Sequence, residues 1–312
     1  MAQGLDWQRD GRDWPHRNVS RFVQAADVHW HVQIIDAKAG PAAPVVLLLH
    51  GTGASTHSWR ALMPLLAERC HVVAVDLPGH GFTGMPVAGA LSRQFTLPGM
   101  AAALGVLLRV LPLPAPSLLI GHSAGAAVAV RMSLDRLVAP RAIVSLNGAF
   151  LPLGGVAGRV LSPVAKLAAV LPGVPALFSR RASEAAVLQR LVDGTGSVLD
   201  AEGVAFYARL AGNAGHVAGA LAMMANWDLT PLARDLPRLA PPLTLMVGSA
   251  DRTIRPAQAQ RVRALLPQAT LLTFDGLGHL AHEEQPQRIA DAVLQAVAGA
   301  HAQGAMTSRP GK

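Results

Sequence analysis

Six short apolar runs, bounded by turn residues and separated by helix-length segments, restrict the fold of this chain most strongly. Their hydrophobicity is nearly continuous rather than alternating, which is typical of strands that helices cover on both faces. Strands that alternate with helices in this way predict a mostly parallel sheet in an α/β fold. The expected strands are Val45 to His50, Val72 to Asp76, Ser117 to Ile120, Ala142 to Leu146, Leu243 to Gly248 and Ala269 to Phe274.

Two further apolar segments precede these runs, Arg21 to Gln24 and Val28 to Ile35. The short connection through Ala26 and Asp27 predicts an antiparallel pair of strands, because only antiparallel neighbours can be joined by so few residues. We expect this pair to form one edge of the sheet.

An insertion interrupts the alternation, since almost one hundred residues separate Asn147 from Leu243 and a single crossover helix needs far fewer. We interpret residues 154–228 as a helical cap over one end of the sheet. The core would then be discontinuous, with residues 1–153 and 229–300, and residues 301–312 would form a loose tail. The expected cap helices are Ser183 to Val192, Ala201 to Ala211 and Val217 to Asn226.

Composition excludes several classes of protein. Among the 312 residues, 51% are hydrophobic and only 15% are charged, which excludes intrinsic disorder. The net charge is +8, but no basic run occurs and aromatic residues make up 4%, so nucleic-acid binding is not expected. The single cysteine, Cys70, excludes an intrachain disulfide and agrees with a reducing compartment. Residues 1–17 lack the apolar segment of a signal peptide, so we expect a cytoplasmic protein.

The segment Gly121-His122-Ser123-Ala124-Gly125 carries the strongest catalytic signal. It follows an expected strand directly and precedes a small-residue helix, Ala124 to Leu134. A serine at such a sharp turn takes a strained backbone conformation that exposes its hydroxyl above the sheet. The flanking positions must be small to avoid collision, and Gly121 and Gly125 meet that requirement. We therefore expect Ser123 to be a nucleophile.

A serine hydroxyl needs a base that a third group orients, so an acid and a histidine are expected further along the chain. Asp251 follows the strand that ends at Gly248, and His279 follows the strand that ends at Phe274. Both loops leave the carboxyl edge of the sheet, where sites of α/β proteins lie. His282 is the competing base, and Asp228 is the competing acid, although Asp228 suits a helix end better. These two remain alternatives at this point.

A tetrahedral intermediate also requires backbone N–H groups aimed at its oxyanion. Thr52, in the glycine-rich loop after the first parallel strand, and Ala124, at the start of its helix, are the expected donors. Metal binding is not expected, because the histidines, His29 and His31 included, form no HExxH segment or comparable ligand set. No cofactor is expected either.

These segments, in this order, resemble the α/β-hydrolase superfamily over nearly the whole chain. The resemblance rests on the loop from His50 to Ser55, the segment from Asp76 to Gly81, the GHSAG turn, Asp251 and His279. It implies a central sheet flanked by helices, with a helical cap. Haloalkane dehalogenases and epoxide hydrolases are similar too, but they carry Asp at the nucleophile position, so Ser123 favours serine hydrolysis.

A narrower resemblance links the chain to the BchO proteins, accessory proteins of magnesium chelatase in bacteriochlorophyll synthesis. It implies a role in tetrapyrrole metabolism near magnesium insertion, with magnesium-chelatase subunits among the partners. The segments that carry it are Asp13 to Arg17, Trp30 to Gln33, His50 to Arg60, Gly194 to Ser197, His216 to Leu229 and Gly278 to Glu284.

The cap composition suggests a substrate class. Residues 148–178 are almost uncharged, and the segment 155–192 carries five basic residues against one acidic residue. An apolar macrocycle that bears carboxylates, such as a porphyrin, would suit this combination, although ordinary cap packing with a solvated Arg rim explains it equally well, and peripheral membrane contact is a third option. The basic residues are Arg159, Lys166, Arg180, Arg181 and Arg190. The expected substrate-binding residues are His122, Trp59, Met223, Met224 and Trp227.

Three hypotheses about function follow from the sequence. The leading one is hydrolysis of an ester-like bond in a small-molecule substrate by Ser123, His279 and Asp251. The second is a non-catalytic accessory protein or chaperone that holds a porphyrin for magnesium chelatase. The third uses the same three residues for carbon–carbon bond cleavage or cofactor-free perhydrolysis, and the sequence does not reveal the pocket polarity that would decide.

Overall fold

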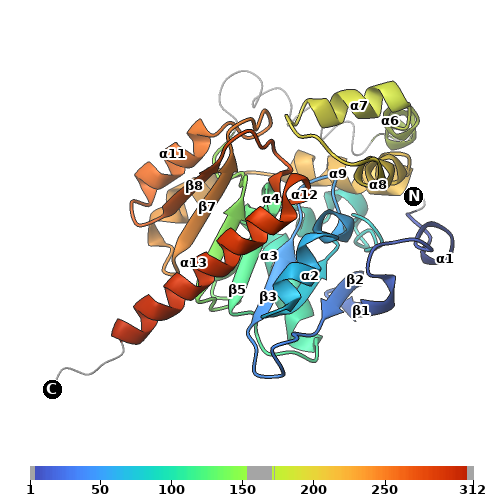
Figure 1. Cartoon of the computed structure of the whole chain (residues 1–312). Coiled ribbons are helices and arrows are strands. Elements are labelled where there is room, and N and C mark those ends of the chain that lie inside the picture. Colours follow the sequence, from blue (N-terminus) through green and yellow to red (C-terminus); the bar gives the residue numbers. More distant parts are fainter. Residues whose placement is uncertain (1–3, 153–170, 172, 308–312) are drawn as a thin grey trace.

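A single eight-stranded sheet forms the centre of the protein (Figure 1). The computed structural model describes residues 4–152, 171 and 173–307. The strand order is β1-β2-β4-β3-β5-β6-β7-β8, and every neighbouring pair from β4 to β8 is parallel. All of the expected strands are present, with ends that differ by at most two residues. They are β1 (Ser20–Ala25), β2 (Val28–Ile35), β3 (Val45–Leu49), β4 (His71–Val75), β5 (Leu118–His122), β6 (Ala142–Leu146), β7 (Leu243–Gly248) and β8 (Thr270–Phe274).

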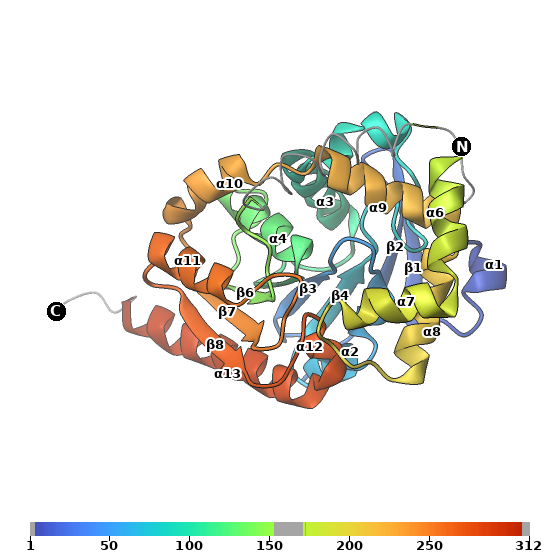
Figure 2. The same cartoon turned by 90° about the horizontal axis from the view of Figure 1, so that it is seen from above.

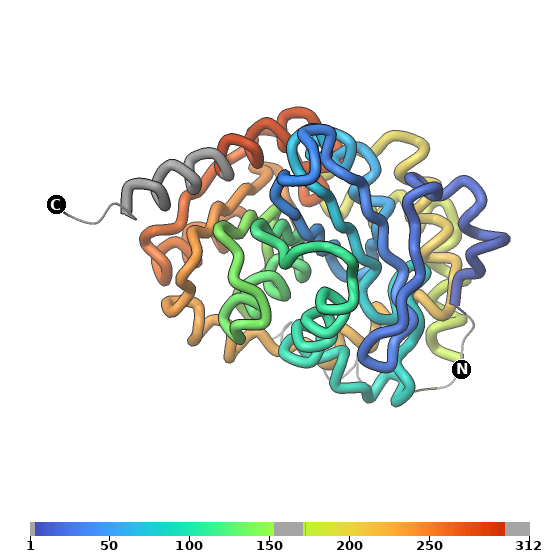
Figure 3. The backbone as a smooth tube through the Cα atoms, turned by 90° about the horizontal axis from the view of Figure 1, so that it is seen from below, coloured from blue at the N-terminus to red at the C-terminus, as the bar shows by residue number. Residues whose placement is uncertain are grey.

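The N-terminal hairpin forms one edge of the sheet, as predicted. Strand β1 pairs only with β2, and β2 is antiparallel to both β1 and β4. Ala26 and Asp27 have φ values of 50° and 58°, the two positive angles that a tight hairpin turn between right-twisted strands requires. Seen from below, this hairpin and the β7–β8 strands lie on opposite sides of the molecule (Figure 3).

Helices cover both faces of the sheet, which explains why its central strands are mostly apolar and fully buried. Side chains of β3 alternate between the two faces: Leu47 packs with α3 and α4, whereas Leu48 packs with α2 and α13, and both are fully buried. Burying one such side chain stabilises the fold by about 2 kcal/mol. The core helices are α2 (Leu62–Ala67), α3 (Leu97–Val110), α4 (Ala124–Leu134), α10 (Thr230–Asp235), α11 (Ala257–Leu265), α12 (Ala281–Glu284) and α13 (Pro286–Thr307), and α1 (Trp7–Asp10) precedes the hairpin.

Four helices between β6 and β7 gather above the part of the sheet that carries β1 and β2 (Figures 1 and 2). They are α6 (Val174–Ala182), α7 (Ala185–Asp193), α8 (Ala201–Ala211) and α9 (Ala214–Asn226). Helix α6 is not among the expected cap helices; Pro175 lies in its first turn, where proline is compatible with a helix. The limits 154 and 228 of the cap stay a prediction. Helix α13 continues to Thr307, so the expected tail begins inside a helix.

Candidate active site

The turn between β5 and α4 has the strained geometry that the sequence predicts. Ser123 has φ 50° and ψ −118°, a region that side-chain-bearing residues rarely occupy and that costs about 1–3 kcal/mol. A Cβ atom on Gly121 would lie 2.3 Å from the Cα of Ala126, and one on Gly125 would lie 2.1 Å from the carbonyl oxygen of Leu49. Only glycine fits at either position, so the backbone can turn sharply and leave Ser123 partly accessible.

Asp251 and His279 form a buried hydrogen-bonded pair at the same edge of the sheet. His279 Nδ1 donates to Asp251 Oδ2 over 2.8 Å, because a carboxylate oxygen can only accept. The second carboxylate oxygen accepts from the N–H groups of Thr253 and Ile254 at 2.8 and 2.9 Å, and Asn147 Nδ2 donates to Oδ2 at 2.6 Å. Sequence reasoning did not find Asn147, which follows β6. These donors hold the carboxylate toward the imidazole.

His122 connects the serine turn to this pair. Its Nε2–H donates to the carbonyl oxygen of His279 at 2.9 Å, and the two rings lie 4.7 Å apart. Burial lowers the pKa of His122 well below its ordinary value, so the ring is uncharged at neutral pH. Since His122 directly precedes Ser123, this contact brings the serine turn and the imidazole of His279 into one site.

His282 lies in the same cluster but lacks the partner that a general base needs. Its ring lies 4.6 Å from that of His122, and neither ring nitrogen has a hydrogen-bond partner within the described residues. Burial lowers the pKa of His282 to about 3. His279, hydrogen-bonded to Asp251, is therefore the better candidate for the base.

The loop after β3 lies against the serine turn. A Cβ atom on Gly51 would lie 2.9 Å from the Cβ of Ser123, so the two backbones approach closely. His50 Nε2 accepts from the N–H of Leu77 at 2.9 Å, which leaves the proton on Nδ1, and Nδ1 donates to the Gly51 carbonyl at 2.8 Å. This carbonyl and the N–H of Thr52 belong to one planar peptide unit, so His50 also fixes the direction of that N–H. Ala124, the other expected donor, opens α4, where N–H groups lack helical partners.

The cap also contributes to this loop, through a residue that sequence reasoning missed. His216 on α9 is fully surrounded by protein; its Nδ1 accepts from the N–H of Gly81 at 3.0 Å, and its Nε2–H donates to the carbonyl of Gly53 at 3.1 Å. Burial lowers the pKa of His216 to about 4. An uncharged histidine thus ties the cap to the loop that contains Thr52.

Comparison with known proteins identifies the family. A model of the alpha/beta hydrolase family matches residues 46–292. The chain belongs to this family. It is 40% identical over 288 residues to the magnesium-chelatase 30 kDa subunit of Rhodobacter capsulatus, a match that covers 92% of this chain and 97% of the relative. The resemblance to both the superfamily and the BchO proteins is thereby confirmed.

Solved structures agree on the fold. An alpha/beta hydrolase fold protein from Burkholderia ambifaria superposes with a TM-score of 0.72 at 21% identity, over 95% of this chain and 100% of that one. An enol-lactonase from Burkholderia xenovorans LB400 superposes with a TM-score of 0.70 at 18% identity, over 89% and 100% of the two chains. At these identities the likeness establishes the α/β-hydrolase fold alone.

The expected substrate-binding residues of this alpha/beta hydrolase differ in exposure. Trp59 is fully buried, with its ring 4.7 Å from that of His282, and His122 is nearly as buried. Met223 is also buried, but its Sδ accepts from the Thr52 hydroxyl at 3.4 Å, beside the candidate oxyanion loop. Met224 is 48% exposed, and Trp227 packs partly against the core. Their roles toward a substrate stay a prediction.

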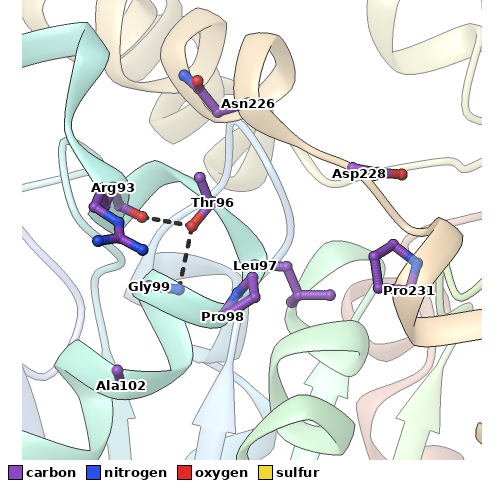
Figure 4. A pocket seen from close by; sticks show the side chains of 9 residues that line it. All are labelled: Arg93, Thr96, Leu97, Pro98, Gly99, Ala102, Asn226, Asp228 and Pro231. Atoms are coloured by element: carbon purple, nitrogen blue, oxygen red, sulfur yellow. Dashed lines mark hydrogen bonds between the residues drawn. The ribbon is translucent and has the colours of Figure 1, made fainter. Parts of the chain in front are cut away.

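Asp228 lies in a different place from the acid–base pair. Its Oδ1 accepts from the N–H of Thr230, the first residue of α10, at 2.9 Å, as expected of a residue at a helix start. Figure 4 shows it beside Asn226 and Pro231, facing a pocket at the start of α3 that neither Ser123 nor His279 lines. This arrangement favours Asp251 over Asp228 as the partner of the base.

The outer surface of the cap combines exposed apolar and basic side chains. Leu177 and Phe178 on α6 are 61% and 51% exposed, and Arg180, Arg181 and Arg190 are exposed nearby on α6 and α7. Arg159 and Lys166, which belong to the predicted basic set, lie outside the described residues. Of the helices within the described ranges, none combines the length and apolar character needed to cross a bilayer.

His31, one of the histidines considered in the sequence, has a structural partner. His31 Nδ1 donates to Asp76 Oδ2 at 2.7 Å, and both side chains are completely buried. Asp76 also accepts from the N–H groups of Thr56 and Phe82, and it thus joins two loops at the top of the sheet. Among residues 4–152, 171 and 173–307, no group of three or more His, Cys, Asp or Glu is arranged to hold a metal ion.

Proposed function

We propose that this protein is a serine hydrolase that cleaves an ester-like bond, with Ser123 as nucleophile, His279 as general base and Asp251 as the group that orients the base. The observation that carries the proposal is the 2.8 Å hydrogen bond between Asp251 and His279, which lies next to a strained serine turn. Because Nδ1 of His279 is engaged by the carboxylate, Nε2 is the nitrogen that takes a proton from the serine.

In the proposed reaction, Ser123 Oγ bonds to the acyl carbon while its proton moves to His279 Nε2. The N–H groups of Thr52 and Ala124 stabilise the negative oxygen of the tetrahedral intermediate. Collapse of the intermediate expels the alcohol, which takes the proton from His279. Water then gives a proton to His279 and attacks the acyl group, and the acid leaves as Ser123 regains its proton. The reaction requires no cofactor.

The proposed setting is tetrapyrrole metabolism near magnesium insertion. The support is the relative of Rhodobacter capsulatus, whose name describes a magnesium-chelatase subunit and which this chain matches over nearly its whole length. The substrate would be an apolar macrocycle with ester or carboxylate groups, such as a porphyrin. Exposed Arg180, Arg181 and Arg190 supply charges that attract carboxylates at the cap surface. Reversing these charges is expected to weaken porphyrin binding.

The proposed location is the cytoplasm, with peripheral contact to a membrane through α6. Leu177 and Phe178 would enter the headgroup region while Arg180 and Arg181 contact anionic lipid, the pattern of an interfacial amphipathic helix. Loss of co-sedimentation with anionic vesicles in a Leu177→Ser/Phe178→Ser variant would support this contact.

A second candidate function is a non-catalytic porphyrin-binding accessory protein or chaperone of magnesium chelatase. The name of the Rhodobacter capsulatus relative favours it, because it describes a subunit of the chelatase. One variant distinguishes the two functions. Ser123→Ala abolishes turnover if the protein is a hydrolase, yet it leaves porphyrin affinity unchanged if the protein only holds the ligand.

Labelling with a fluorophosphonate probe tests the hydrolase. Wild type should be labelled, and Ser123→Ala and His279→Ala should not, because the first removes the nucleophile and the second its base. A porphyrin carboxylate or its methyl ester should compete with the probe if the substrate is a tetrapyrrole. A folded wild type that does not react would contradict the activated serine and favour the accessory function.

A further inference from the structure

The turn between α7 and α8, residues 194–197, lies against the two loops that carry Asp251 and His279. In sequence it belongs to the cap, and its Gly-Thr-Gly-Ser segment is part of the resemblance to the BchO proteins. None of its residues takes part in the reaction proposed above. Backbone groups of Thr195 and Gly196 and the buried hydroxyl of Ser197 make its contacts.

The carbonyl oxygen of Thr195 is shared by both catalytic loops. It accepts from the N–H of His279 at 3.1 Å and from the N–H of Arg252, the residue after Asp251, at 3.2 Å. One oxygen atom of the cap therefore fixes the backbone at the base and beside the acid, on loops that are 28 residues apart in the chain.

Ser197 adds a second connection to the loop of the base. Its side chain is buried, and Oγ accepts from the N–H of Leu280, the residue after His279, at 2.8 Å. Glu284 completes the arrangement, because its two carboxylate oxygens accept from Gly278 N–H at 2.8 Å and from Val198 N–H at 3.2 Å. Leu280 is thus bonded to the turn directly, and Gly278 is connected through one carboxylate to Val198, the residue after the turn.

The backbones meet so closely that side chains are excluded. A Cβ atom on Gly196, whose φ is +78°, would lie 2.1 Å from the carbonyl oxygen of Ala250, next to Asp251. A Cβ atom on Gly278 would lie 2.3 Å from the carbonyl carbon of Gly196. Such contacts leave no room for the turn to slide along either loop.

We propose that the turn 194–197 positions the acid–base pair, so that this part of the cap is a fixed support of the site rather than a lid that lifts away from it. The inference rests on the proposed hydrolase function. The hydrogen bond between Asp251 and His279 requires two separate loops to keep their spacing, and a shift of 1 Å would lengthen it beyond useful reach. Thr195 and Ser197 set that spacing from the cap side.

Ser197→Ala tests the proposal, and Val198→Ala is the matched control. The first variant removes the acceptor of the Leu280 N–H, whereas Val198 is 80% exposed and bonds to Glu284 through its backbone N–H, which the substitution keeps. The low-field NMR signal of the proton between His279 Nδ1 and Asp251 reports the pair directly, without turnover. In Ser197→Ala we expect this signal to shift or broaden and fluorophosphonate labelling to slow at least tenfold. In Val198→Ala the proton signal should keep its wild-type position, and the labelling rate should stay within twofold of wild type.

The two readouts separate this inference from the function on which it rests. A folded Ser197→Ala protein with the wild-type proton signal would overturn the positioning role, whatever its labelling rate. If wild type is not labelled but the signal changes in Ser197→Ala, the hydrolase fails and the positioning role stands. Gly196→Ala, which collides with Ala250, should disturb the signal further; if it does not fold, Ser197→Ala alone decides.

Discussion

Two of the junctions between the cap and the core differ in charge. The neutral junction consists of His216 and Gly219 on α9 against Gly53, Gly79 and Gly81 of the core loops. Its contacts are bonds of an uncharged imidazole and direct backbone packing, since a Cβ on Gly219 would lie 2.0 Å from the carbonyl oxygen of Gly79.

The charged junction consists of Arg60, Asp200, Tyr207 and Glu283. Glu283, just beyond His279, accepts from Arg60 Nη1 at 2.6 Å and from the Tyr207 hydroxyl at 2.8 Å, and Arg60 Nη2 donates to Asp200 at 2.7 Å. Burial raises the pKa of Glu283 to about 7, and Arg60 and Tyr207 oppose that rise. One junction is therefore packed without charge, and the other holds a carboxyl group that titrates near neutrality.

This difference gives the two junctions opposite responses to pH. Between about pH 4.5 and 7, folded Glu283 keeps a proton that the unfolded chain releases, so its contribution to stability is full at low pH and lost as pH rises through 7. His216, whose pKa falls from 6.5 to about 4, contributes fully above pH 6.5 and loses its contribution as pH falls toward 4. Polar contacts of similar length can thus contribute to stability with opposite dependences on pH.

The largest effect is expected from breaking the neutral junction with Gly219→Ala. The added methyl overlaps the Gly79 carbonyl, and α9 must move, at a cost of about 3 kcal/mol in the free energy of unfolding. Urea denaturation measures the change. Gly105→Ala is the control, because its methyl would meet Leu137 at an ordinary 3.4 Å, and it should be neutral or slightly stabilising. Equal effects of the two substitutions would contradict the close packing described here.

Removing the titrating carboxyl of the charged junction should produce the next largest change. Relative to Glu283→Gln, wild type should gain about 2 kcal/mol of stability as pH falls from 7.5 to 5.5, since one pKa unit corresponds to about 1.4 kcal/mol. The amide can accept from Arg60 through its oxygen and donate to the Tyr207 oxygen through its NH2 group, but it does not titrate. Urea denaturation of both proteins at the two pH values measures the difference, and a constant difference would show that Glu283 does not titrate in this range.

The smallest effect is expected at His216, with the opposite sign. The advantage of wild type over His216→Asn should shrink by about 1 kcal/mol over the same fall in pH, because only the unfolded chain of wild type gains a proton there. Thermal unfolding at pH 7.5 and 5.5 provides the measurement. An advantage that grows on acidification would mean that folded His216 accepts the proton, and the assigned neutral state would then be wrong.

Sequence patterns predicted the sheet well, because a strand that is buried on both faces is a short, continuous apolar run in the sequence. Ala142–Leu146 and Leu243–Gly248 have the bounds that their apolar runs indicated, and the helix Ala124–Leu134 begins directly after Ser123 as expected. Helix α6 was missed, since Pro175 is a breaker in the interior of a helix but acceptable in its first turn, and the pattern does not tell these positions apart.

The candidate site was predictable only where each residue belongs to a strand end. Ser123, Asp251 and His279 could be proposed because each follows its strand closely, although their catalytic roles stay a prediction. His216 and Glu283 lie in segments that carry the resemblance, but their roles could not be predicted, because the partners of each lie more than 70 residues away in the chain.

The sequence by itself determined the parallel sheet, the edge hairpin and the strained serine turn, because hydrophobic patterns and glycine positions act over a few residues. Tertiary structure alone decided which charges are buried and which histidines are neutral, since desolvation depends on every element packed around a group. It also decided that a turn of the cap bonds the loops of Asp251 and His279, because backbone N–H and C=O groups carry no residue identity and pair wherever folding places them.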